Sequence, residues 1–479
     1  MKTRFLIVSI ALGLALSVGL VVVFCAPAGA LSAHAVAQPS AGLVVDVAPS
    51  PLSARQAIST AYVVVRFGAH DAIVRPITFT EPISAYHALE LSGLAFTTAD
   101  MGYGPYLCSI AEVGDSSPAC DNGTQFWSTA EWNAAAMRWD ARMVGVADAL
   151  IANDGHVEGF SWSDPDWLPV DPPPAPALTA AWQALAWLKT QQQANGGFGS
   201  PGNTTEVLMA LGANRMRGGD WQQSNGASAA SAILNQGATL AATTAGSGKL
   251  ALALSSQDAC WPYSALRPAD YYSVTTGAFS LDAAPHALAM LGTAALSETL
   301  PASATAYLLS LQQPNGGWEW GVGWGVDTNS TALALQALIA AGEAPTATAV
   351  ISGLAYLKQA QNVDGGFPYD PASSTGTGSD VNSTAYVVQA LLATGEDPLS
   401  GAWATDPTTG TLVIGGANPI AFLLEMQLPD GSFEWQAGLG FSQMATQQAA
   451  TALLYRPFPV KTAQLATCRA VFLPFVTRD

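Results

Sequence analysis

One phrase occurs four times in this chain, and it constrains the fold more than any other feature. Each copy opens with an aromatic–Leu pair, carries Gln at its sixth position and Asn or Asp at its ninth, and closes on an aromatic at its twelfth. The copies are WLKTQQQANGGF (187–198), YLLSLQQPNGGW (307–318), YLKQAQNVDGGF (356–367) and FLLEMQLPDGSF (422–433). Repetition at this interval predicts stacked helical units, none of which can bury its apolar face alone.

A second helical segment follows each phrase. Residues 331–341 and 384–393 are apolar on every side except for Gln336 and Gln389, so we expect helices that are buried all round. The helices before the phrases are more polar and can face solvent. The interval between the first two copies is about twice the others, and QDACWPY (257–263) near its midpoint reads as a degraded fifth copy. Alternating inner and outer helices predict a mostly α fold, a six-over-six α/α toroid over residues 178–456.

The repeat and its helix pairing resemble the prenyltransferase and squalene-cyclase repeat family, whose hallmark is Gln-x-x-[Asp/Asn]-Gly-[Gly]-[Trp/Phe]. We interpret the phrase itself as structural. Its Gln can bond to free backbone groups at the start of the next helix. Its glycines allow tight turns with positive φ, and its aromatic fills the gap between helix layers.

The chemistry that the resemblance implies should lie where the inner helices start. Class II terpene cyclases carry Asp-x-Asp-Asp there, and the middle Asp must stay protonated to act as an acid. The matching segments here read Asp327-Thr328-Asn329-Ser330 and Asp380-Val381-Asn382-Ser383, with an amide in the middle position. The sequence also lacks an Asp-Asp dipeptide, so the magnesium motif of class I prenyl chemistry is missing. We therefore assign no catalytic residue and no metal ligand.

His286 is the only histidine of the predicted toroid, and a lone His on an apolar helix is more often a core residue than a metal ligand. Asn329 and Asn382 are either helix caps or amides that line the bowl. The aromatic residues before these helices either floor a ligand site or fill gaps between helices. As candidate ligand-binding residues we take the following set: Asp327, Asn329, Asp380, Asn382, Trp320, Trp324, Tyr369, Gln336 and Gln389.

A different pattern precedes the toroid. The proline-dense stretch DPDWLPVDPPPAPA (164–177) predicts a stiff spacer. Before it, β-branched runs around GAHD predict a hairpin, PISAYHALELSGL predicts a helix, and later segments alternate like strands. Residues 42–163 thus predict a small α+β, β-grasp-like domain. The segments YLCSI, FWSTAEWN, MRWD and DGHVEGFSW resemble the ubiquitin-like domain of transcobalamin and intrinsic factor, with His156 and Phe160 departing from that pattern.

The first residues have two cations, an apolar run and then small residues, which predicts a signal peptide over 1–37. An uncleaved membrane anchor is the alternative, because the run is nearly long enough to span. Removing Lys2 and Arg4 leaves 15 cations against 35 acids, and this acidity argues against a nucleic-acid partner. We expect a secreted protein without a membrane span after cleavage. Attachment to the cell surface through the tail 457–479 is an alternative. Cys108 and Cys120 are the expected disulfide, and the pairing of Cys260 and Cys468 stays open.

Transcobalamin and intrinsic factor combine the same two modules in the reverse order and hold a corrinoid between them. That resemblance implies an exported, non-catalytic protein that binds a small-molecule or cell-surface ligand at the toroid bowl. The most specific form of this prediction names a corrinoid as the ligand. A divergent terpenoid cyclase or prenyl-transfer enzyme with Asp327 or Asp380 as its acid is the alternative. A surface adhesin or carbohydrate-binding toroid is the third reading.

Overall fold

A computed structural model describes residues 57–460 except for 69–70, 103, 118, 121–124, 164–172, 375 and 405–416. The predicted signal peptide and the tail beyond Val460 lie outside the described residues. All described residues belong to one compact unit. Helices predominate over strands, as the repeat predicts. No helix among the described residues combines the length and the apolar character that a membrane crossing requires.

The strand-rich region is built on a five-stranded mixed sheet in the order β2–β1–β10–β7–β8. Strands β1 and β2 pair as the predicted antiparallel hairpin, while β1 pairs with β10 in parallel. Helix α1 (Ala85–Leu91) buries Ala88 and Leu89 in a core shared with Phe160 of the sheet. The strands are β1 (Ser59–Gly68), β2 (Asp71–Phe79), β3 (Ile83–Ser84), β4 (Phe96–Asp100), β5 (Pro105–Ile110), β6 (Val113–Gly114), β7 (Phe126–Asn133), β8 (Arg138–Ala141), β9 (Leu150–Ile151) and β10 (Val157–Ser163).

Cys108 and Cys120 form a disulfide with their Cα atoms 5.3 Å apart, the pair that the sequence favours. Cys260 is disulfide-bonded as well.

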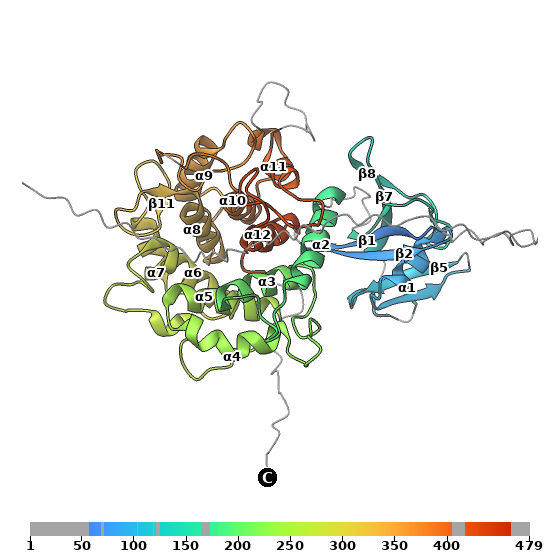
Figure 1. Cartoon of the computed structure of the whole chain (residues 1–479), viewed down its shortest axis with the longest axis horizontal. Helices are drawn as coiled ribbons and strands as arrows, with labels where there is room; N and C mark the ends of the chain where they lie inside the picture. Colours follow the sequence, from blue (N-terminus) through green and yellow to red (C-terminus); the bar gives the residue numbers. More distant parts are fainter. Residues whose placement is uncertain are drawn as a thin grey trace, which may run out of the picture. The chain divides into compact units, whose positions relative to one another are not determined.

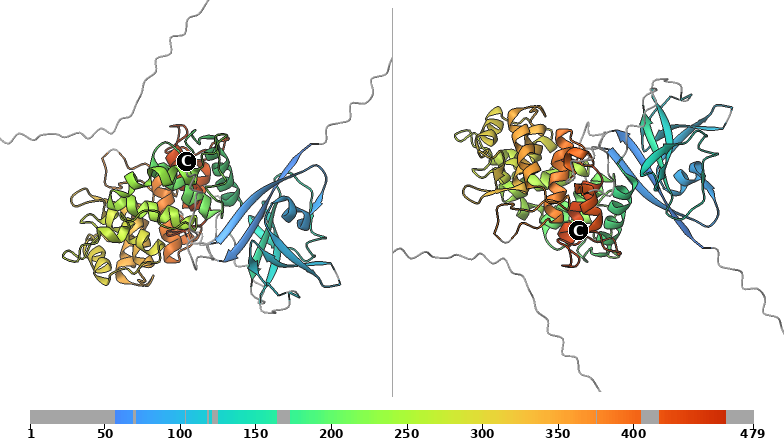
Figure 2. Two further views of the ribbon diagram at one scale, coloured as in Figure 1. Left: turned by 90° about the horizontal axis from the view of Figure 1, so that it is seen from below. Right: turned by 90° about the horizontal axis from the view of Figure 1, so that it is seen from above.

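Six helices contact one another in a closed cycle, each meeting the next and α12 returning to α3. These inner helices are α3 (Pro201–Ala213), α5 (Thr244–Ser256), α6 (Ala283–Ala295), α8 (Thr328–Ala340), α10 (Val381–Thr394) and α12 (Gln443–Leu453). The outer elements are α2 (Ala175–Thr190), α4 (Ala229–Ala241), α7 (Ala302–Ser310), α9 (Thr348–Ala360) and α11 (Pro419–Glu425). Figure 1 shows α4, α7, α9 and α11 around the outside of the inner helices. Figure 2 shows from two further sides that the helices coloured green to red gather in one body.

The outer layer is incomplete before α6. There the structure has only a short 3-10 helix, η1 (Pro268–Tyr271). Two-residue strands, β11 (Trp318–Glu319) and β12 (Val326–Asp327), close the loop before α8. A second 3-10 turn, η2 (Gly401–Trp403), precedes α11.

The glutamine of each phrase links two repeats. Its Nε2 donates to the carbonyl of the phrase's own glycine and to a backbone carbonyl beside or within the next outer helix. Gln312 reaches Gly316 O at 2.7 Å and Ala349 O at 2.9 Å. The other three bond in the same way: Gln192 to Gly196 and Trp221, Gln361 to Gly365 and Trp403, and Gln427 to Gly431 and Ala180.

The closing aromatic is tied to the inner helix by one further bond. The backbone N–H of Trp318 donates to Oγ1 of Thr331 in the first turn of α8. The same bond joins Phe198 to Thr204, Phe367 to Thr384 and Phe433 to Thr446. In the long interval between Phe198 and Trp318 the equivalent donor is Phe279, whose backbone N–H donates to Nδ1 of His286. Phe279, and not Trp261 of QDACWPY, therefore occupies the repeat position.

Two predicted boundaries shift. Helix α2 begins at Ala175, inside the predicted spacer, because proline is tolerated in the first turn of a helix. At the other end, residues 457–460 of the predicted tail pack into the helical core, with Phe458 and Val460 buried. The helical body therefore extends beyond 178–456 at both ends.

Candidate functional site

The segment that follows α12 packs against the inner helices through two of the candidate residues. The backbone N–H of Phe458 donates to Oε1 of Gln336 in α8 over 2.8 Å. Gln389 in α10 donates from Nε2 to the carbonyl of Arg456 over 2.8 Å. Both glutamines are fully or almost fully buried. Their amides bind this chain's own backbone in the structure, which explains why two all-apolar helices each retain one Gln.

Arg456 connects the same segment to two other elements. Its guanidinium donates to the carbonyl of Ala213 at the end of α3 over 3.1 Å and pairs with Asp71 in the β1–β2 hairpin. Arg215 also pairs with Asp71, at 2.5 Å. Burial lowers the pKa of Arg456, and the Asp71 carboxylate opposes that shift. This end of the helical ring is therefore closed by the chain itself.

A polar cluster lies among the inner helices α3, α5, α10 and α12, and we call its five residues the inner cluster: Glu206, Lys249, Asn382, Tyr386 and Gln448. Lys249 donates to Glu206 Oε1 over 2.7 Å, and the Tyr386 hydroxyl lies 3.5 Å from the same oxygen. Gln448 donates to the Tyr386 hydroxyl over 3.3 Å and accepts from Asn382 Nδ2 over 2.6 Å. One candidate residue, Asn382, thus belongs to a network that spans four helices.

The charges of the inner cluster are fixed by its geometry. Burial is the largest single effect and disfavours a charged Lys249, but Glu206 and Tyr386 together outweigh it and raise the pKa of the ammonium above its ordinary value. Burial and the Glu206 charge raise the pKa of Tyr386 to about 12. The cluster therefore presents a protonated amine and a neutral phenol near neutral pH. The Lys249 side chain keeps 27% of its surface exposed, so the cluster is reachable from solvent.

Asp327 and Asp380 cap the inner helices α8 and α10, and each is only 2% exposed. Asp327 accepts from the backbone N–H and the hydroxyl of Ser330, at 2.7 and 2.6 Å. Burial raises the pKa of Asp327 to about 6; the Ser330 bonds oppose this rise, and the nearby Asp370 charge adds to it. Burial likewise raises the pKa of Asp380, which accepts from Ser383 in the same way. Both are therefore sequestered carboxyl groups that hold a proton more readily than an exposed Asp.

The remaining candidates lie around the first of these caps. Asn329 is partly buried at the start of α8. The carbonyl of Tyr369 accepts from the backbone N–H of Thr328, and burial together with the charges of Asp327 and Asp370 raises the pKa of its phenol to about 12. Trp320 is partly buried, and its carbonyl accepts from Ala284. Trp324 is 76% exposed and does not form the floor of a site.

His286 is a core residue, as its position on an apolar helix predicts. It is fully buried; Nδ1 accepts from Phe279, and Nε2 donates to the carbonyl of Ala304 over 2.9 Å. Burial lowers the pKa of His286, so the ring is neutral. Among the residues that the structure describes, no group of three or more His, Cys, Asp or Glu side chains could hold a metal ion.

Sequence reasoning missed Glu206 and Lys249. Each is the only charged residue of its helix, in PGNTTEVLMALGA and TAGSGKLALALSS. A single charge on a helix without a polar face was the available signal, since such charges are rarely buried unless paired.

A family model, the squalene-hopene cyclase C-terminal domain, matches residues 264–445. The match covers less than half of the chain. It begins just before η1, ends in the first turn of α12, and includes both Asp327 and Asp380. No curated protein sequence matches the chain.

Solved structures that align with the chain include a type II terpene cyclase, MstE from Scytonema, at 15% identity and a TM-score of 0.40. That alignment covers 58% of this chain and 98% of the other. An ent-copalyl diphosphate synthase from Streptomyces platensis aligns at 17% identity and a TM-score of 0.35, covering 53% and 49% of the two chains. A glycosidase in complex with glucose aligns at 14% identity and a TM-score of 0.35, covering 58% and 96%.

The family match corrects the main functional prediction. A non-catalytic binding protein with a corrinoid-like ligand is contradicted, because residues 264–445 match the model of a cyclase family. The sequence alone favoured the binding protein because an amide replaces the middle acid of the cyclase motif. The match supports placing the helical repeats in the prenyltransferase and squalene-cyclase repeat family.

Proposed function

We propose that this chain is a terpenoid-cyclase-like enzyme that protonates and rearranges an isoprenoid substrate. The observation that carries the proposal is the cyclase family match over residues 264–445. The match includes Asp327, a carboxyl whose pKa is raised to about 6 by burial at an inner helix start. Protonation of an alkene needs a carboxylic acid kept neutral by its surroundings, and Asp327 meets that need better than an exposed Asp.

In this proposal Asp327 supplies the proton and Ser330 orients its carboxyl group. Asp380 is the second acid candidate, held in the same way by Ser383. Asn329 and Asn382 stand where the middle acid of the related motif would be, so the proton donor is the first residue of the motif instead. The inner cluster offers the polar end of a substrate hydrogen-bond donors from Lys249, Gln448 and Asn382.

The test compares wild type with Asp327→Asn and Asp380→Asn on squalene and geranylgeranyl diphosphate, with products separated by gas chromatography after dephosphorylation where needed. Asp282→Asn is the matched control. Asp282 caps α6 at the same repeat position, but it is exposed and makes no side-chain capping bond. We expect cyclised product from wild type and Asp282→Asn and a loss of at least about 100-fold in Asp327→Asn, typical for removal of a general acid. Equal turnover in Asp327→Asn and wild type would reject the assignment.

We also propose the finer architecture and location that the sequence suggests. The closed cycle of inner helices supports a six-over-six toroid in which η1 replaces one outer helix. The hairpin, helix and parallel β1–β10 pair support a β-grasp relationship for the strand-rich region. The Cys108–Cys120 disulfide supports export to an oxidising compartment. Fractionation of the producing cells, with detection of the protein in the medium or on the surface, tests export.

A further inference from the structure

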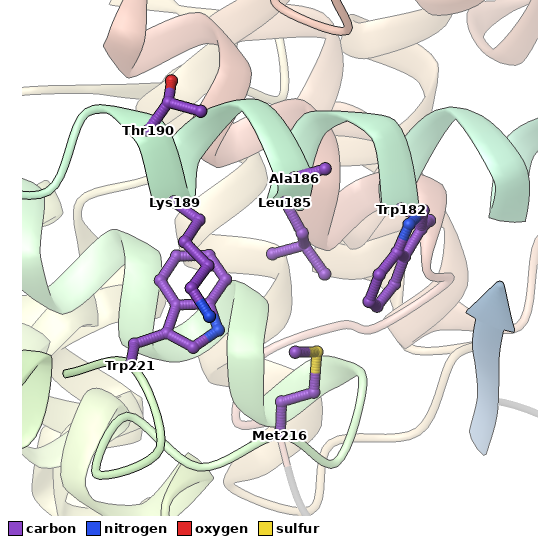
Figure 3. A pocket seen from close by; sticks show the side chains of 7 residues that line it. All are labelled: Trp182, Leu185, Ala186, Lys189, Thr190, Met216 and Trp221. Carbon is purple, nitrogen blue, oxygen red and sulfur yellow. The ribbon is translucent and has the colours of Figure 1, made fainter. Parts of the chain in front are cut away.

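A cavity of about 450 Å³ lies beside α2, and none of its lining residues belongs to the inner cluster or to the capping acids. Figure 3 shows Trp182 at one end and the Trp221 ring beneath Lys189 at the other, with Leu185 and Met216 between them. Ala186 also lines it, while Thr190 points away from the other side chains in this view. The volume falls within the range of small-molecule pockets, and the walls are mostly apolar.

One wall is held in place by the repeat. The Trp221 carbonyl accepts from Gln192 over 2.7 Å, and its ring packs against Phe198 at 6.1 Å between centroids. Trp221 is only 3% exposed. This end of the cavity is therefore pre-formed and needs no ordering when a ligand binds.

Lys189 is the only charged residue that lines the cavity, and it lies over the Trp221 ring at 5.7 Å. Within the described part of the chain, no hydrogen bond or ion pair engages its ammonium group. The lysine at the same position of another phrase, Lys358, has a hydrogen-bond partner. Lys358 occupies the same phrase position, and its ammonium lies 5.4 Å from the Trp403 ring, but it donates to Gln361 Oε1 over 2.8 Å. The Lys358 ammonium therefore already has a hydrogen-bond partner, while that of Lys189 has none among the described residues.

We propose that this cavity binds a small amphiphile with an apolar body and one anionic group. The apolar part of the ligand would lie between Trp182 and Trp221 and would contact Leu185 and Met216. The anionic group would meet the Lys189 ammonium, which has no hydrogen-bond or ion-pair partner among the described residues. The site is independent of the proposed cyclase chemistry, because none of its residues belongs to the inner cluster or the helix caps.

The test is isothermal titration of the purified protein with sodium decanoate, decyltrimethylammonium and decan-1-ol, the two ions below their micelle concentrations and the alcohol below its solubility limit. We expect saturable binding of decanoate, weaker binding of the alcohol and the weakest binding of the cation. Lys189→Gln should weaken decanoate binding about twofold to fivefold, the range for losing one exposed charge contact. Lys358→Gln, the matched control, should bind as wild type does.

Ala186→Trp fills the cavity from an exposed position and should weaken decanoate binding at least tenfold while leaving the thermal midpoint within about 2 °C of wild type. Three results would each overturn the proposal. These are no saturable binding of decanoate, equal binding of decanoate and decyltrimethylammonium, or equal decanoate affinity in wild type, Lys189→Gln and Ala186→Trp.

Discussion

Gln427 in the last phrase donates its side-chain N–H to the carbonyl of Ala180 in α2, 2.9 Å away and 247 residues earlier in the chain. In the other three phrases the equivalent glutamine reaches forward along the chain, to Trp221 before α4, to Ala349 in α9 and to Trp403 in η2 before α11. The last copy has no next outer helix among the described elements, and its partner is the first one. The same short-range hydrogen bond thus closes the ring.

Replacing Gln427 by Ala should therefore weaken ring closure. The change leaves two carbonyls, those of Ala180 and Gly431, without their donor, and we expect the free energy of unfolding to fall by about 1 to 3 kcal/mol. Urea denaturation measures the loss, and hydrogen exchange should rise in α2 and α11. Gln359→Ala, at an exposed position in α9, is the control and should change stability by less than about 0.5 kcal/mol. Equal stability of the two variants would contradict this role.

A second prediction concerns the glycine that follows the Asn or Asp of each phrase. Gly316 has φ +89°, and a Cβ there would lie 2.3 Å from the carbonyl oxygen of Ser352 in α9. Gly342 has φ +94° and open space around it. Both Gly→Ala changes carry the strain of a positive φ, about 1 kcal/mol, but Gly316→Ala should lose a further 1 to 3 kcal/mol or so because α9 must move. Chemical denaturation of both variants gives the difference between their losses in unfolding free energy. A difference near zero would show that the outer helix is free to shift.

Most of the helical architecture could be read from the sequence because the repeat specifies contacts locally. The Gln, the turn glycine and the aromatic each fix a bond within about twenty residues or to the next repeat, and the structure shows those bonds. The partners of Gln336 and Gln389 could not be read in the same way. They lie 122 and 67 residues away, in the segment after α12, which has no repeat pattern.

The inner cluster shows a second limit of sequence reasoning. Glu206 and Lys249 are 43 residues apart on different helices, and neither forms a motif. Only the ring brings them together with Tyr386 and Gln448. The capping acids were identified from their motif, but their raised pKa values depend on burial by loops of later repeats, which the sequence does not reveal.

The pKa of Asp327 leads to a third prediction, a stability that falls as the pH rises. Its native pKa of about 6 exceeds the ordinary value of 3.8. Between these values the native state holds a proton that the unfolded chain has released, so this group stabilises the fold below about pH 4 and loses that contribution through about pH 6. The full difference is about 3 kcal/mol.

Comparing unfolding free energies of wild type and Asp327→Asn from pH 4 to 7 isolates this effect, because Asn does not titrate. Wild type should lose stability relative to Asp327→Asn as the pH rises. Asp282→Asn, at an exposed helix cap, is the substitution control. Parallel pH profiles for wild type and Asp327→Asn would mean that Asp327 titrates like an exposed carboxyl group.

The Lys249–Glu206 pair gives the fourth prediction. Lys249→Met removes the amine and leaves the Glu206 carboxylate, 5% exposed, without its cationic partner. Breaking a buried pair on one side costs about 3 to 5 kcal/mol, and the 27% exposure of Lys249 reduces the expected loss to about 2 kcal/mol. Glu206→Gln should cost less, because a neutral amide can still accept from Lys249 and Tyr386. In the double variant the loss of stability should be smaller than the sum of the two single losses, as expected for residues in contact.

Arg138→Met, which breaks the exposed pair with Asp140, is the control and should cost less than about 1 kcal/mol. A Lys249→Met variant as stable as Arg138→Met would show that Glu206 is solvated in the native ring, and the inner cluster would then be an open, water-filled site.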